Sequence, residues 1–112
     1  MTGTAVELAA VNGTTSDAGV AHGARLVAFA EAVMADDLPV RERGRHALRA
    51  VLSDECFVDA AAIVAAFNVV DRIADSTGIP LDDMMLAMSG DVPTRLDLVR
   101  FASSANTPGV PR

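Results

Sequence analysis

The side chains best suited to covalent or acid–base chemistry in this chain are one thiol, Cys56, and two imidazoles, His22 and His46. Cys56 falls in the first turn of a predicted helix, where the helix dipole favours a thiolate nucleophile. Three nearby carboxylates oppose that effect: Asp54, Glu55 and Asp59. Because the chain has a single cysteine, only a disulfide to another chain or an external thiol could complete a redox cycle. Two interpretations of Cys56 stay open, a half-buried structural residue and a catalytic or redox thiol.

The two histidines differ in their surroundings. His22 lies on the polar side of a helix predicted over residues 20–35, where an imidazole can serve general acid–base catalysis or can simply be solvated. His46 lies among arginines on a predicted solvent face, which indicates no site. The sequence has no His-x-x-x-His or Cys-x-x-Cys spacing, so we expect no transition-metal site and no cofactor.

A polar cluster follows at helical spacing and consists of Asn68, Asp71, Arg72 and Asp75. Asn68 and Arg72 are four residues apart and share a helix face, while Arg72 and Asp75 are three apart. One interpretation is a binding cluster of Asn68, Arg72 and Asp75 that lines a pocket at a subunit boundary. The other is structural, with Arg72 pairing with a carboxylate or capping carbonyls and Asn68 satisfying a backbone group.

The element that must position most of these residues is a long helix between Ser53 and Pro80. Ser53 is a favourable N-cap, and Gly78 can adopt the left-handed conformation that ends a helix. Residues 60–67 contain no polar side chain. A helix that is apolar on every face is expected to be surrounded by others. The chain offers few other elements to surround it, so we expect part of its surface to be covered by a second copy in a homo-oligomer.

The remaining elements are predicted from turn and cap residues. A short lead occupies residues 1–16, a helical domain residues 17–101, and a disordered tail residues 102–112. Within the domain we expect helices over residues 20–35, from Asp36-Asp37 and Pro39 to about residue 52, from Pro80 through Met88, and over residues 93–101. The methionines Met84, Met85 and Met88 are expected in a core or interface, or as a soft docking surface.

Composition narrows the class of protein. At 112 residues, rich in Ala, Val and Leu and without Trp or Tyr, the chain is expected to form one all-α domain. A net charge of −6 argues against a nucleic-acid partner. No apolar run approaches the ~20 residues of a membrane span, and no basic n-region of a secretory signal is present. We therefore predict a cytoplasmic protein without a membrane partner.

The long helix resembles a known family. The residues Ser53-Asp54-Glu55, Val58-Asp59-Ala60, Phe67-Asn68, Arg72, Ala74-Asp75, Gly78 and Leu81-Asp82 are similar to a pattern of the carboxymuconolactone decarboxylase and alkylhydroperoxidase D superfamily, in its peroxidase-related branch. The resemblance covers roughly residues 11–83. It implies a small helical bundle of the alkylhydroperoxidase D-like type, completed by oligomerisation.

The chemistry that this resemblance implies depends on residues that the chain lacks. The peroxidases carry a motif like N-G-C-x-x-C-x-x-x-H, and this chain has Asn12-Gly13 and His22 at the two flanks. Counting from Asn12-Gly13 places Thr14 and Asp17 at the cysteine positions, and counting back from His22 places Thr15 and Ala18 there. Neither alignment finds a thiol, and the two differ by one residue.

We therefore predict a non-catalytic or catalytically degenerate member of that family, acting as an oligomeric helical binding or accessory protein. Its partners would be further copies of the chain, together with a small-molecule ligand or another protein. Two enzymatic alternatives remain: a cysteine-independent enzyme resembling the lactone decarboxylases and using His22, and a thiol peroxidase or redox protein using Cys56 across a dimer.

Overall fold

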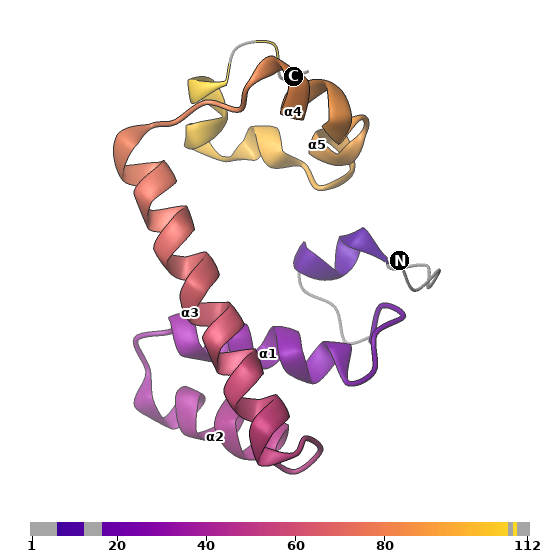
Figure 1. Ribbon diagram of the computed structural model, residues 1–112, viewed down its shortest axis with the longest axis vertical. Helices are drawn as coiled ribbons and strands as arrows, with labels where there is room; N and C mark the ends of the chain where they lie inside the picture. The colour runs from indigo at the N-terminus through magenta and orange to yellow at the C-terminus, as the bar shows by residue number, and fades with distance from the viewer. Residues whose placement is uncertain (1–6, 13–16, 108, 110–112) are drawn as a thin grey trace. The chain divides into compact units, whose positions relative to one another are not determined.

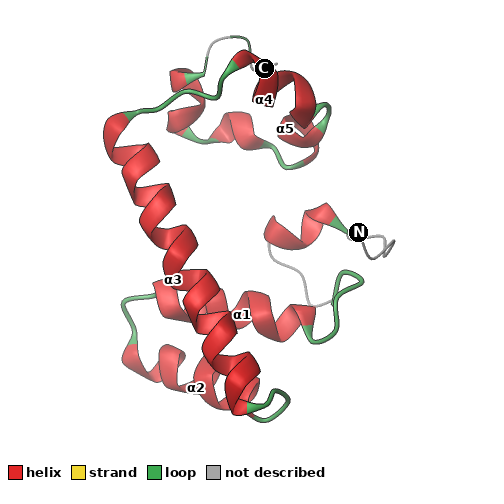
Figure 2. Cartoon of the chain, viewed as in Figure 1, coloured by secondary structure: helices red, strands yellow, loops and turns green. Residues whose placement is uncertain are grey.

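The computed structural model describes residues 7–12, 17–107 and 109 of the chain. Every regular element in these residues is a helix, and none is a strand (Figure 1, Figure 2). The chain is thus a small all-α protein of about five α-helices, as its composition predicts. It divides into two compact units, Met1–Phe67 and Asn68–Arg112, and the longest helix contributes residues to each.

The first unit is built on a helical hairpin of α1 (Gly23–Met34) and α2 (Leu38–Arg49), preceded by the 3-10 helix η1 (Leu8–Asn12). Asp37 caps α2, since its carboxylate accepts a hydrogen bond from the backbone N–H of Val40 at 2.9 Å. The small core consists of Ala10, Phe29, Ala32 and Leu48, and only Leu48 among the described residues is completely buried. Gly44 lets the two helices approach closely, because a Cβ built on it would lie 2.7 Å from the Cβ of Ala32.

The predicted start of the first helix, at residue 20, is wrong by three residues. His22 has a left-handed backbone, with φ of 59° and ψ of 20°, and α1 begins only at Gly23. The cap comes from further away in the sequence, since the Asp17 carboxylate accepts a hydrogen bond from the backbone N–H of Ala24 at 3.0 Å. His22 is therefore an exposed residue at the N-terminus of α1, and not a residue of a helix face.

The long helix α3 (Asp54–Thr77) has the predicted ends. The Ser53 hydroxyl accepts a hydrogen bond from the backbone N–H of Cys56 at 3.3 Å. At the other end Gly78 has φ of 65°, and the N–H of Ile79 donates to the carbonyl of Ala74 at 3.2 Å. This pattern is the Schellman ending that the Gly78 position predicts.

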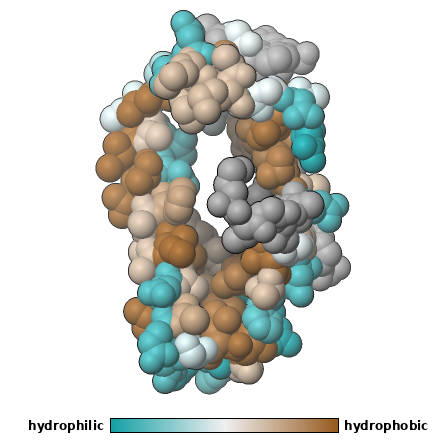
Figure 3. Space-filling model, turned by 45° about the vertical axis from the view of Figure 1, so that its right-hand side comes forward, coloured by the Kyte–Doolittle hydropathy of each residue, from teal (hydrophilic) through white to brown (hydrophobic). Residues whose placement is uncertain are grey.

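The chain does not surround α3, as the small number of other predicted elements indicated, since none of its residues is buried. Its exposed apolar side chains are Val58, Ile63 and Phe67 in the first unit and Val69, Val70 and Ile73 in the second, each between 56% and 65% exposed. The surface of both units in Figure 3 accordingly shows large hydrophobic areas among the hydrophilic ones. A single copy of the chain leaves the apolar faces of α3 open to solvent.

The second unit contains the C-terminal part of α3, then α4 (Asp83–Ser89), α5 (Val92–Arg95) and the 3-10 helices η2 (Leu98–Arg100) and η3 (Ala102–Asn106). Pro93 is the one residue of its described part that is buried. The backbone N–H of Leu81 donates to the Thr107 hydroxyl at 3.0 Å, which ties the chain after α3 to the C-terminal segment.

Three sequence predictions differ, at least in part, from this unit. The helix expected over residues 93–101 is broken into α5 and η2, because Asp97 has a left-handed backbone with φ of 51°. The methionines Met84, Met85 and Met88 are 67%, 48% and 74% exposed, so they form no core. The segment 102–112, predicted to be a disordered tail, includes η3, and residues 108 and 110–112 lie outside the described residues.

Candidate functional site

An apolar groove of about 560 Å³ lies between α1 and α3 in the first unit. This volume is within the range of ~300–1,000 Å³ that is usual for small-molecule sites. α1 contributes four apolar side chains, the turn before α3 contributes one, and α3 contributes five side chains: Leu26, Val27, Phe29 and Ala30, then Leu52, then Cys56, Asp59, Ala60, Ile63 and Val64.

Helical periodicity explains why these residues share the groove. The α3 residues recur at intervals of three and four, which places Cys56, Ala60 and Ile63 on one face of the helix. The lining combines small side chains, Ala30 and Ala60, with larger ones such as Phe29. The sequence prediction missed the groove, although the apolar residues at helical spacing in α1 and α3 were a usable signal.

An aromatic contact fixes the N-terminal part of α3 over the helical hairpin. The rings of Phe29 and Phe57 have centroids 5.4 Å apart at an interplanar angle of 57°. The Arg49 guanidinium lies 5.7 Å from the centroid of the Phe57 ring, and Arg49 also donates to the Asp54 carboxylate at 3.0 Å. Because Phe57 points to α1 and α2, the neighbouring Cys56 is held at the groove.

The polar groups of the groove are few. Cys56 is a free thiol and is exposed, and Asp59 is an exposed carboxylate. The lining contains no histidine and no second thiol. Such a groove can hold the apolar body of a ligand and offers one sulfur and one carboxylate, but its lining provides neither a resolving thiol nor an imidazole base for Cys56.

One carboxylate next to the groove has a shifted pKa. The backbone N–H of Glu55 and the hydroxyl of Ser53 hydrogen-bond to the Glu55 carboxylate and hold its pKa below the ordinary value. Hydrogen bonds that stabilise the charged form of an acid lower its pKa. The effect adds to the N-terminal capping of α3, since the carboxylate remains charged where the helix dipole is positive.

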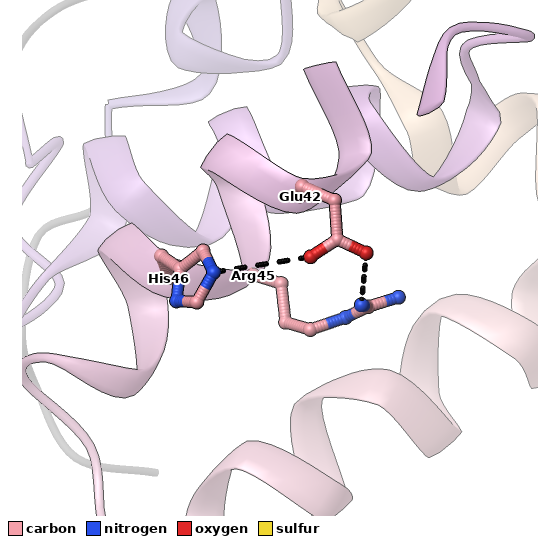
Figure 4. Close-up of polar contacts among 3 residues, drawn as sticks. All are labelled: Glu42, Arg45 and His46. Carbon is pink, nitrogen blue, oxygen red and sulfur yellow. Dashed lines mark hydrogen bonds and ion pairs between the residues drawn. The ribbon is translucent and has the colours of Figure 1, made fainter. Parts of the chain in front are cut away.

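The other candidate residues do not join the groove. His22 does not line it, and the side chain of His22 makes no capping hydrogen bond. His46 is 81% exposed on α2, as predicted, with its Nε2 at 3.9 Å from one oxygen of the Glu42 carboxylate (Figure 4). Arg45 donates to the other oxygen, so these three residues form a polar cluster on α2.

The polar cluster of α3 lies in the second unit. Asn68 and Arg72 share a face, as predicted, and Arg72 Nε donates to the Asn68 side-chain oxygen at 2.7 Å. Asp75 is exposed. The site interpretation of Asn68, Arg72 and Asp75 gains no support from the groove, which they do not line.

Within residues 7–12, 17–107 and 109, no group of three or more His, Cys, Asp and Glu side chains is arranged to hold a metal ion. In the same residues, no helix has both the length and the apolarity needed to cross a membrane.

The fold and the groove define a small all-α protein with an apolar groove in its first unit. Comparisons of the chain with protein-family models, with curated proteins and with solved structures gave no match.

Proposed function

We propose that the chain is an oligomeric helical binding or accessory protein, in which copies of the chain cover the apolar surface of α3. The scaffold would be an alkylhydroperoxidase D-like bundle that has no thiol-peroxidase chemistry. The residue pattern from Ser53 to Asp83 supports that scaffold. The single cysteine and the lining of the groove, which holds no second thiol, support the lack of thiol-peroxidase chemistry.

The observation that carries the proposal is the exposure of six apolar side chains on α3. Full burial of such a side chain contributes about 1.5–3 kcal/mol. Since each of the six is roughly 60% exposed, covering them all contributes roughly 5–11 kcal/mol per copy. A micromolar dissociation constant corresponds to about 8 kcal/mol. Because association also costs translational and rotational freedom, we expect self-association in the micromolar range.

The groove supports the binding role. It adjoins the α3 surface through Ile63, which both lines the groove and is 59% exposed. A ligand with an apolar body would displace water from nearly the whole lining. Its polar end would then meet Cys56 or Asp59.

The test is the native mass measured by light scattering, over protein concentrations from about 1 to 100 µM, the range in which a micromolar complex forms. We expect a mass above the 11.6 kDa of one chain. Phe67→Glu places a charge on the α3 surface and should give the single-chain mass with the helical circular dichroism retained. Ala47→Glu is the matched control, because it adds the same charge at an exposed position of α2 and should leave the mass unchanged.

Cys56 gives a second measurement. The thiol is exposed in one copy, so covering α3 should slow its reaction with a thiol reagent as the protein concentration rises. A strictly single-chain mass at the highest concentration, together with a cooperative thermal transition, would show that the chain needs no second copy and would overturn the proposal.

A further inference from the structure

The apolar groove between α1 and α3 has one charged residue in its lining, which is Asp59. Asp59 is three residues after Cys56 and four before Ile63, so the three residues share a face of α3. Phe57, which packs on Phe29, lies about 160° away from Asp59 around the helix. Asp59 is therefore at the outer edge of the groove, where it is exposed.

The carboxylate of Asp59 is available to a ligand. In the part of the chain that the structure describes, Asp59 takes part in no ion pair. The nearby Asp54 differs, because Arg49 donates to its carboxylate at 3.0 Å. The groove thus combines an apolar lining with one unbalanced negative charge at its edge.

We propose that the groove binds an amine with an apolar body, which lies between α1 and α3 and places its ammonium group at Asp59. This inference rests on the binding role proposed above and names the class of ligand. An aliphatic amine such as that of lysine has a pKa of about 10.4 and is charged at neutral pH. Burial of the apolar body in the lining drives binding, while an ammonium group at the exposed edge avoids the cost of burying a charge.

The single charge distinguishes this class from two related ones. A carboxylic acid with the same apolar body would place a negative charge next to Asp59, and like charges repel. A neutral alcohol would keep the apolar contacts without gaining an ion pair. The amine alone uses both the lining and the carboxylate.

The proposal is tested by isothermal titration calorimetry with decylamine, decanol and decanoate, which share one alkyl chain. At neutral pH we expect decylamine to bind at least about fivefold more tightly than decanoate, from attraction in one case and repulsion in the other. The affinity for decylamine should fall as salt is added, because an exposed ion pair is screened. Equal affinities for the three compounds, or tighter binding of decanoate, would overturn the proposal.

Variants locate the binding site. Asp59→Asn should weaken binding of decylamine by about two- to fivefold and leave that of decanol unchanged. Asp71→Asn is the matched control, because Asp71 is an exposed aspartate of the same helix that does not line the groove, and it should change neither affinity. Ala60→Leu, which fills the groove, should weaken both compounds by about tenfold or more with the helical circular dichroism retained. Unchanged decylamine binding in Asp59→Asn or in Ala60→Leu would place the amine elsewhere and overturn the proposal.

The Phe67→Glu variant separates this inference from the proposed self-association. Phe67 does not line the groove, so the variant should bind decylamine as tightly as the original chain does. Loss of decylamine binding in Phe67→Glu would assign the groove to the surface between copies and overturn the inference. Selective decylamine binding by a chain that keeps the single-chain mass at every concentration would support the inference and refute the oligomer. A raised native mass without selectivity for decylamine would do the reverse.

Discussion

Substitution of Gly44 by alanine tests whether the close packing of α1 against α2 outweighs the higher helix propensity of alanine. Gly44 lies in the interior of α2, and a Cβ added there would be 2.7 Å from the Cβ of Ala32. Ala32 is only 4% exposed, and its Cβ is fixed to the backbone and cannot rotate away. Accommodating a new methyl group therefore requires α1 and α2 to move apart.

The two effects have opposite signs. Replacing glycine by alanine inside a helix stabilises a protein by about 0.5–1 kcal/mol when space is available. Overpacking a tight contact costs about 1–3 kcal/mol. We therefore expect Gly44→Ala to lower the free energy of unfolding by about 0.5–2 kcal/mol.

The assay is urea unfolding followed by circular dichroism, applied to a double-mutant cycle. Ala32→Gly removes the opposing methyl group, so the variant that combines Ala32→Gly with Gly44→Ala should be more stable than the sum of the single changes by about 1–3 kcal/mol. Ala47→Gly, at an exposed position of the same helix, calibrates helix propensity and should cost about 1 kcal/mol. A Gly44→Ala protein that is more stable than the original chain, with additive behaviour in the cycle, would refute the close approach of the helices.

Two further predictions concern the core and the start of α3. Leu48→Ala should lower the free energy of unfolding by about 2–5 kcal/mol, because Leu48 is completely buried. Leu38→Ala, at a 62% exposed position of the same helix, should lower it far less. Equal losses for the two variants in urea unfolding would contradict the burial of Leu48. The pKa of Glu55, followed by nuclear magnetic resonance, should lie below its ordinary value and rise in Ser53→Ala. Since the folded pKa is the lower one, the stabilisation by these hydrogen bonds is present above the unfolded pKa and is lost as the pH falls through the folded pKa. A Glu55 that titrates at its ordinary value in the original chain would show that the hydrogen bonds do not form.

Local capping chemistry made parts of the fold predictable. Asp37, Ser53 and Gly78 mark ends of α2 and α3, and each acts within a few residues of its own position. Asp17 is a suitable N-cap for α1 by its residue type, but the position at which α1 starts was not predictable in this way. Asp17 reaches the N–H of Ala24, seven residues away, across a turn with left-handed residues. The break at Asp97 likewise needs a left-handed backbone that its residue type alone does not dictate.

The candidate site was less predictable than the helices. Cys56 was singled out from its residue type, but the groove beside it depends on how Phe57 packs against Phe29, which is a contact between distant segments. The periodicity of α3 alone does not show whether the helix is covered, because burial depends on the number of neighbouring elements. The small number of other predicted elements did indicate that the chain leaves part of α3 uncovered, and none of its residues is buried.

The position of the one thiol has a practical consequence for work on assemblies of this protein. Cys56 is exposed near the N-terminal end of α3, a helix of 24 residues. A nitroxide spin label would attach there without any engineered cysteine, and each copy would carry one label. Copies whose long helices run side by side in the same direction would bring the labels close together, whereas opposite directions would separate them by roughly 30 Å. Pulsed electron resonance distinguishes these two distances directly.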